Sequence, residues 1–269
     1  MDNLSDLTKQ LRADIIRMIT AAGSGHPGGS LSVIDILTVL YAKHLRHDPK
    51  RPDWPDRDRL VLSKGHACPA LYAVMAHEGY FPKEELMTLR KLGSRLQGHP
   101  ERHRLPGIEA ATGSLGQGPS IALGMALAAK LDKTEQRVYV VCGDGELQEG
   151  QVWEALMAAP KFKLDNLTFI VDSNNGQIDG HVNEIMCLEP LAEKLKGFNW
   201  DTRVIDGHDL GAIDAALAAV KTVKGKPQAI VATTIKGKGV SFMENNIAWH
   251  GKAPNKQECE QALKEILGA

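Results

Sequence analysis

An acidic residue inside a glycine turn is the first feature of this sequence that could do chemistry. Gly143-Asp144-Gly145 directly follows an apolar run over residues 138–142, and a helical pattern begins at Gly150. Glycines let the backbone approach a phosphate closely, and the free amides of a helix N-terminus attract it. A carboxylate beside a diphosphate is repulsive unless a cation lies between them. Asp144 therefore predicts a diphosphate that binds through Mg²⁺ or a similar ion.

Amide oxygens follow the next predicted strand. The run over residues 167–172 ends in Ser173-Asn174-Asn175-Gly176, at a distance along the chain that suits one crossover helix. One carboxylate, one side-chain amide and one backbone carbonyl, with diphosphate oxygens and a water, would complete the octahedral set that Mg²⁺ prefers. Taken singly, Asp144 could cap a helix and the asparagines could form an ordinary turn. A nicotinamide site does not fit, because Gln148 stands where GxGxxG needs its last glycine.

Three histidines, His26, His66 and His99, each lie in a glycine-flanked turn. Imidazoles near neutral pKa can donate hydrogen bonds to hydroxyls or move protons at cellular pH. Each histidine alone could equally be structural or merely exposed. A three-histidine zinc site is conceivable, but no HxH or HExxH spacing supports it.

The elements that must position these residues alternate along the chain. Apolar residues at helical spacing predict an opening helix that ends at Gly23-Ser24-Gly25, and a second helix over residues 31–45. Strands are predicted over residues 59–63, 138–142, 167–172, 203–205 and 229–234, with helices between them such as 213–220. Residues 46–58 are expected to form a surface loop, and residues 261–267 a short last helix. This alternation predicts an α/β fold with a doubly wound, mostly parallel sheet covered on both faces. Ligands bind such sheets at the carboxyl ends of the strands.

Composition narrows the class of protein. The chain has 269 residues with 43% hydrophobic content, which predicts one globular domain over residues 1–269. Lys plus Arg number 32 and Asp plus Glu number 33, so a nucleic-acid or membrane partner is not expected. No apolar run is long enough to span a membrane, and the opening residues do not resemble a secretory signal. Four scattered cysteines predict a reducing cytoplasm.

Several motifs together resemble one enzyme family. Gly143-Asp144-Gly145 followed by Asn174-Asn175 is similar to the GDG…NN motif of thiamine-diphosphate enzymes, and residues 143–150 resemble the transketolase version. Four further segments look like transketolase segments in their expected order: residues 24–30, 62–67, 97–101 and 112–118. The resemblance covers nearly the whole chain.

The resemblance implies a thiamine-diphosphate-binding fold and a set of cofactor contacts. It implies that Asp144, the Asn174 side chain and the Gly176 carbonyl hold Mg²⁺, with Ca²⁺ or Mn²⁺ as alternatives. The continuation Ile178-Asp179-Gly180 favours Asn174 over Asn175 as the metal ligand. Cofactor contacts are implied for His66, Gly113, Leu115, Gly143, Asp144, Gly145, Asn174 and Gly176.

The resemblance also assigns roles to histidines. It implies that His26, His66 and His99 contact the ketose or the cofactor, bind hydroxyls and assist proton transfer. His250-Gly251 matches a His-Gly pair of the family. The family has another active-site histidine shortly before that pair, where this chain has Ile247. Either His250 substitutes for it or that contact is missing.

Two glutamates, Glu149 and Glu154, flank the start of the helix predicted after Asp144. Without the resemblance they are acids that interact with the helix dipole. In transketolases the matching acids join a subunit-interface network that links paired cofactors. The resemblance implies this role for Glu149 above all.

The transketolase resemblance finally implies a partner. The family carries its pyrimidine-binding and sugar-phosphate-binding residues in later domains, whereas this chain stops soon after residues 250–254. We therefore expect a split transketolase, a heterotetramer with a C-terminal subunit. It would move a two-carbon ketol unit from a ketose phosphate to an aldose phosphate, as in the pentose phosphate pathway. The alternatives are a deoxyxylulose-phosphate synthase-like half, a transketolase for an unusual sugar or sulfosugar, and a non-catalytic subunit. Residues 97–101 and 114–118 favour transketolase over the synthase.

Overall fold

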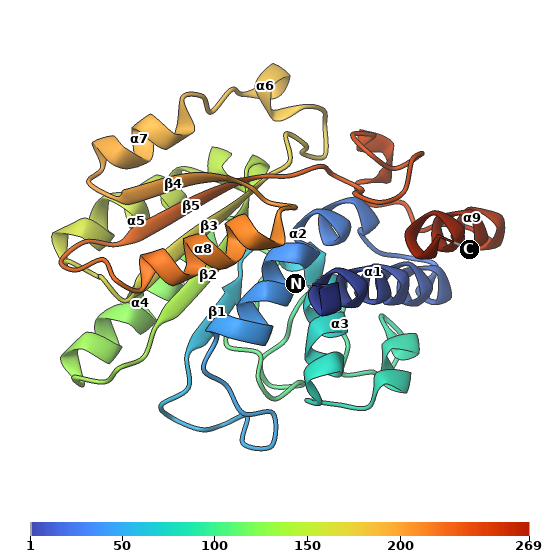
Figure 1. The fold of residues 1–269 in the computed structure, drawn as a ribbon, viewed down its shortest axis with the longest axis horizontal. Coiled ribbons are helices and arrows are strands. Elements are labelled where there is room, and N and C mark those ends of the chain that lie inside the picture. The colour runs from blue at the N-terminus through green and yellow to red at the C-terminus, as the bar shows by residue number, and fades with distance from the viewer. Residues whose placement is uncertain (1, 269) are drawn as a thin grey trace.

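A parallel sheet forms the centre of the molecule in the computed structural model, which describes residues 2–268 (Figure 1). Its five strands lie in the order β1-β2-β3-β5-β4, and all neighbours pair in parallel. The strands are β1 (Arg59–Leu62), β2 (Val138–Gly143), β3 (Leu167–Ser173), β4 (Asp201–Asp206) and β5 (Gln228–Thr233). The predicted α/β fold with a parallel sheet is confirmed.

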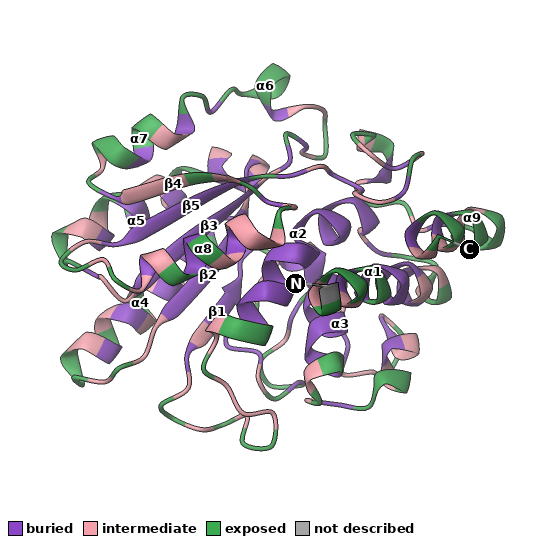
Figure 2. Ribbon diagram, viewed as in Figure 1, coloured by how far each residue is buried: buried purple, intermediate pink, exposed green. Residues whose placement is uncertain are grey.

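Helices cover both faces of the sheet because alternate strand residues point to opposite faces. One core cluster holds Tyr139, Val141 and Ile170, and it is covered by α1 (Asp2–Ala22), α2 (Pro27–Val39), α3 (Cys68–Glu78), α8 (Leu210–Val220) and α9 (Lys256–Leu267). The other holds Val140 and Phe169 under α4 (Gln117–Leu131), α5 (Gly150–Lys161), α6 (Val182–Ile185) and α7 (Leu191–Gly197). Strands β2 and β3 are buried along almost their whole length (Figure 2), which explains their continuous apolar sequence.

Several helices begin earlier than the apolar pattern predicts, because polar or proline residues start them. Helix α2 begins at Pro27 rather than residue 31, since proline suits the first helical turn, and it continues as a π-helical turn over Leu40–His44. Helix α8 begins at Leu210 because the Asp209 carboxylate accepts hydrogen bonds from the first free amides. Helix α9 begins at Lys256, behind a capping box made by Asn255 and Glu258.

The strand register brings distant segments together at the carboxyl edge of the sheet. Gly143 lies opposite Asp172, and Ser173 lies opposite Thr233. The turns that follow β1, β2, β3 and β5 therefore meet at this edge, as expected for an open parallel sheet. Over residues 2–268, no helix combines the length and the apolar character that crossing a membrane requires.

Candidate active site

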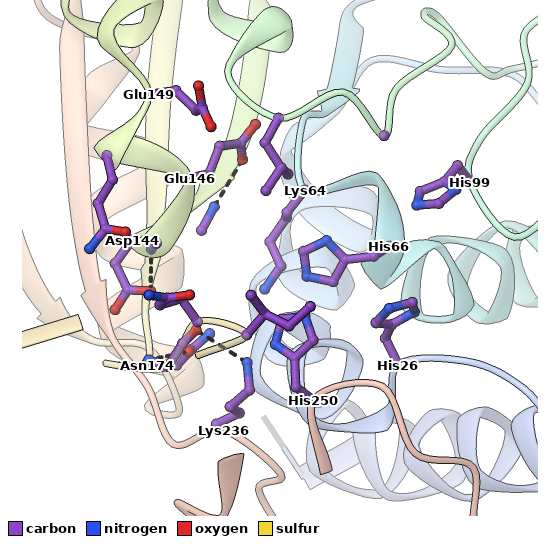
Figure 3. A pocket seen from close by; sticks show the side chains of 18 residues that line it. His26, Lys64, His66, His99, Asp144, Glu146, Glu149, Asn174, Lys236 and His250 are labelled. Carbon is purple, nitrogen blue, oxygen red and sulfur yellow. Dashed lines mark hydrogen bonds between the residues drawn. The ribbon is translucent and has the colours of Figure 1, made fainter. Parts of the chain in front are cut away.

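A cavity of about 350 Å³ opens at the carboxyl edge of the sheet. Figure 3 shows its imidazoles on one side, Asp144 and Asn174 on the other, and two lysines between them. All but one of the residues for which the sequence predicts a site role line this cavity: His26, His66, His99, Gly113, Leu115, Gly143, Asp144, Gly145, Glu149, Asn174, Gly176 and His250. These residues come from seven separate parts of the chain, so the tertiary fold alone brings them together. Glu154, in contrast, lies on the exposed surface of α5.

The Asp144 carboxylate is buried where β2 ends. Its Oδ1 accepts a hydrogen bond from the Gly145 amide at 2.8 Å, and its Oδ2 accepts one from the Asn175 amide at 2.5 Å. Burial raises the pKa of Asp144 to about 6, and the nearby Asp172 carboxylate adds to this shift. The two turns after β2 and β3 are thus joined through one carboxylate.

Asn174 is held in one orientation by its neighbours. Its Nδ2 donates to the Asp172 carboxylate at 3.2 Å, so its Oδ1 turns the other way and accepts from the Gly176 amide at 3.1 Å. The Gly176 carbonyl accepts a hydrogen bond from Lys236 Nζ at 3.3 Å. Residues that carry a carboxylate, a side-chain amide and a backbone carbonyl therefore lie together on this wall of the cavity. Asn175, which was the alternative ligand, adopts a left-handed conformation and its side chain accepts from the Asn183 amide.

A buried ion pair supports these oxygens. Lys64 Nζ donates to the Asp172 carboxylate and to the Gly29 carbonyl, and both charged side chains are almost fully buried. Asp172 also accepts from the hydroxyls of Ser32 and Thr234. Burial opposes its charge, but the Lys64 ammonium holds the pKa of Asp172 below its usual value.

Lys236 brings a second buried cation to the cavity. Burial lowers the pKa of Lys236 to about 8, and the Lys64 ammonium contributes to this shift. Two buried lysine side chains in one small cavity favour an anionic ligand.

Four imidazoles form the opposite wall. The ring centroids of His26 and His66 lie 5.2 Å apart, and His250 lies 5.2 Å from His66 and 5.5 Å from His26. Burial, the first cause in each case, lowers the pKa of His26 to about 4 and that of His250 to about 3, and lowers the pKa values of His66 and His99. The rings are therefore neutral near pH 7, when they can donate or accept hydrogen bonds. Over residues 2–268 no group of three His, Cys, Asp or Glu side chains has the geometry to hold a metal ion, so the zinc alternative gains no support.

Glu146 connects three glycine-rich turns at the same edge. Its carboxylate accepts from Ser63 Oγ, from the Gly116 amide at 2.9 Å and from the Gly143 amide at 3.2 Å. A Cβ on Gly113 would lie 2.9 Å from the His99 ring, so this position has room for glycine only. Hydrogen bonds to Glu146 and close packing thus hold the turns that line the cavity against one another.

Residues 4–269 match the family described as "Transketolase, thiamine diphosphate binding domain". The chain belongs to the transketolase family. The predicted family, its thiamine-diphosphate-binding fold and the transferase class of enzyme are confirmed.

Relatives within the transketolase family come in two lengths. The 6-deoxy-6-sulfo-D-fructose transketolase subunit SqwG of Clostridium sp. (strain MSTE9) is 46% identical, over 96% of this chain and 95% of its own. An apulose-4-phosphate transketolase subunit of Actinobacillus succinogenes is 40% identical, over 98% of this chain and 96% of its own. The transketolase of Mus musculus is 43% identical over 98% of this chain, which spans 42% of that protein. The chain thus has the length of the relatives that are named as transketolase subunits, and it spans less than half of the longer transketolase.

A solved transketolase has the same fold. The structure of the Campylobacter jejuni enzyme superposes with a TM-score of 0.93 at 38% identity, covering 99% of this chain and 43% of that chain. This likeness confirms the parallel sheet and its helices as the transketolase arrangement.

The sequence prediction missed three charged residues of the cavity: Lys64, Glu146 and Lys236. Each had a signal, since Lys64 and Glu146 lie inside motif segments and Lys236 precedes the Gly237 to Gly239 turn. Their burial was not predictable, because a lysine or glutamate in a turn is usually exposed. His250 lines the cavity, directly after the short turn Ile247–Trp249, and its substitution for the family histidine at the position of Ile247 stays a prediction.

Proposed function

We propose that this chain holds the diphosphate end of thiamine diphosphate through Mg²⁺ and works as the N-terminal half of a two-chain transketolase. The observation that carries the proposal is that oxygen-bearing groups of Asp144, Asn174 and Gly176 line one cavity together with two buried lysines. Together they offer a place for a divalent cation and for the anion that it bridges.

The residues present fit this cofactor. The donor set contains one carboxylate and two neutral oxygens, which suits Mg²⁺ bound with a diphosphate, and Ca²⁺ or Mn²⁺ by the same chemistry. A Cβ on Gly145 would lie 2.6 Å from Gln177 Cβ, so only glycine lets the backbone of this turn pack closely beside the cavity. The Nδ1 atom of His250 is buried without a partner among the described residues, as expected where a ligand supplies one.

Different residues of the chain would bind the diphosphate, contact the rest of the cofactor and bind the sugar. Lys64 and Lys236 would balance the diphosphate charge, while Gly113, Leu115, Gly143 and Gly145 contact the cofactor. Thiamine diphosphate, when bound, supplies the reactive thiazolium carbon that carries the two-carbon unit. His26, His66, His99 and His250 would hold sugar hydroxyls and pass protons, because neutral imidazoles donate through one nitrogen and accept through the other.

A partner chain and self-association complete the proposal. Apolar residues stay exposed around α4 and α5, with Leu131 72% and Met157 61% exposed, and nothing lies within 4 Å of a Cβ on Gly124. A helix that is apolar on all sides usually packs against something. We assign this surface to a second copy, with the exposed Glu149 at its rim, and the C-terminal subunit to the mouth of the cavity, which gives a heterotetramer.

The proposal also covers the class of sugar on which the enzyme acts. We propose a ketose phosphate donor and an aldose phosphate acceptor, as in the pentose phosphate pathway, and the relatives named as transketolases support this choice. A second candidate is a sulfosugar, because the relative named for 6-deoxy-6-sulfo-D-fructose is 46% identical over almost its whole length. We also propose that residues 1–269 form one domain and that the enzyme is cytoplasmic. The four free cysteines support a cytoplasmic location, because disulfides are rare in that reducing compartment.

The test is native purification of the tagged chain from its own cells, with mass analysis of what co-purifies. The purified material is then assayed for ketol transfer with thiamine diphosphate and Mg²⁺, using sugar phosphates and 6-deoxy-6-sulfo-D-fructose as separate donors. A stoichiometric second chain together with transfer supports the proposal. The Asp144→Ala variant is the matched control, which should retain the second chain but show no transfer. Full activity of the isolated chain would contradict the two-chain arrangement.

A further inference from the structure

Arg90 has an unusual backbone conformation beside the cavity. It follows the short helical turn Lys83–Thr88 and has a φ of 58°, in the left-handed region that a long side chain rarely adopts. Its amide donates to the Leu96 carbonyl at 2.9 Å, which closes the loop on this conformation. Such strain persists only where the surroundings enforce it, and it often marks a functional constraint.

The guanidinium group of Arg90 bridges two histidine-bearing turns. Nη1 donates to Ser24 Oγ at 3.2 Å, and Nη2 donates to the Gly98 carbonyl at 3.2 Å and to His26 Nδ1 at 3.4 Å. A Cβ on Gly98 would lie 2.7 Å from the Arg90 Cζ, so glycine leaves room for this packing. Arg90 therefore connects the turn that carries His26 with the turn that carries His99.

The contact with Arg90 determines the protonation pattern of the His26 ring. A guanidinium has five N–H donors and no acceptor, so His26 Nδ1 must accept. The proton of the neutral ring then lies on Nε2, the atom that faces Gly251, 3.5 Å from where a Cβ there would be. Gly251 follows His250, whose ring lines the cavity and lies 5.5 Å from the His26 ring, so Nε2 points toward the segment that carries His250.

We propose that Arg90 is a positioning residue that fixes His26 as the neutral Nε2–H tautomer, so that this imidazole presents a hydrogen-bond donor to the sugar. The role of the sugar in this inference rests on the proposed function, whereas the tautomer does not. The same guanidinium orients the His99 turn through the Gly98 carbonyl.

The electrostatic surroundings of His26 agree with a neutral ring. Burial lowers its pKa, Arg90 is the second cause, and His99 and Lys236 contribute. The rings of His66 and His250 also face it. All of these neighbours are cationic or neutral, so none of them stabilises an imidazolium.

The test uses the full-length chain alone, ¹⁵N-labelled on histidine, with His26 assigned through a His26→Gln variant. Long-range ¹H–¹⁵N spectra report which ring nitrogen carries the proton. In the wild type we expect a pyridine-like Nδ1 and a protonated Nε2. In Arg90→Met we expect a mixture of His26 tautomers and a His26 titration midpoint shifted to higher pH. Arg90→Lys keeps the positive charge but loses the bridging hydrogen bonds, so it separates the effect of the charge from that of the bridge. Arg95→Met removes a neighbouring arginine that pairs with Glu85, so it should leave His26 unchanged.

A second variant displaces the guanidinium without removing it. Gly98→Ala would push on the flexible end of Arg90 and should change the His26 tautomer as Arg90→Met does. Gly197→Ala is its control, because a Cβ there meets nothing within 4 Å. A wild-type His26 protonated on Nδ1, or an unchanged tautomer and midpoint in Arg90→Met, would overturn the inference. Because neither cofactor nor partner is present, failure of the transketolase proposal would leave this result standing.

Discussion

Lys64→Met is the substitution whose effect on the free energy of unfolding can be estimated best, because it removes one partner of a fully buried ion pair beside the cavity. Asp172 is 0% exposed and Lys64 is 1% exposed. Removing one partner of a buried pair typically costs about 3–5 kcal/mol, because the remaining charge has no partner in a medium of low polarity. Hydroxyls of Ser32 and Thr234 still donate to Asp172, so we expect the lower end, about 3 kcal/mol. Methionine keeps much of the lysine volume, so the cost of a cavity is small.

The assay is equilibrium unfolding in urea of Lys64→Met, Asp172→Asn and the double variant. Each single substitution leaves one buried charged group without its partner, so the double variant should lose less stability than the sum of the two. A loss of about 3 kcal/mol is a large part of the total stability of a typical domain, so the urea midpoint should fall clearly. A loss below about 1 kcal/mol for Lys64→Met, or strictly additive effects, would refute the reasoning from the buried pair.

Four further predictions concern the site and its supports. Asp144→Asn should abolish Mg²⁺-dependent binding of thiamine diphosphate in calorimetry, as chelation of the metal does in the wild type; unchanged binding would remove the metal assignment. Burial lowers the pKa of His26 to about 4, so the unfolded chain binds more protons between pH 6.5 and 4. His26 should therefore lower the free energy of unfolding as pH drops through that window, by at most about 1.4 kcal/mol for each pH unit, and His26→Gln should make the curve shallower by that share while the other lowered histidines keep theirs. Gly118→Ala would overlap the Ser63 side chain and lie 3.0 Å from its Cα, so it should destabilise the chain by about 1–3 kcal/mol in a thermal melt. Met157→Glu should shift the sedimentation of the protein toward the monomer, and unchanged sedimentation would argue against the α4–α5 surface as the self-association site.

Local patterns in the sequence were sufficient to find the elements and the motif turns. Apolar runs such as residues 138–142 become buried strands because a strand covered on both faces needs apolar side chains throughout. Helix starts were less well predicted, since Pro27 and Asp209 start helices through local geometry and capping rather than apolar spacing. The positions of Asp144 and Asn174 at neighbouring strand ends also followed from the alternation of strands and helices.

The sequence by itself determined the type of fold, the family and the residues that could bind a metal and a diphosphate, because glycine turns and strand periodicity are local properties. Only the tertiary structure decided which charges are buried beside them. Lys64 and Lys236 are ordinary surface residue types, yet the fold places both in the cavity, 172 positions apart along the chain (236 − 64). Arg90 likewise reaches His26 across 64 positions. Burial and long-range contact depend on how the whole chain packs, and no local pattern specifies them.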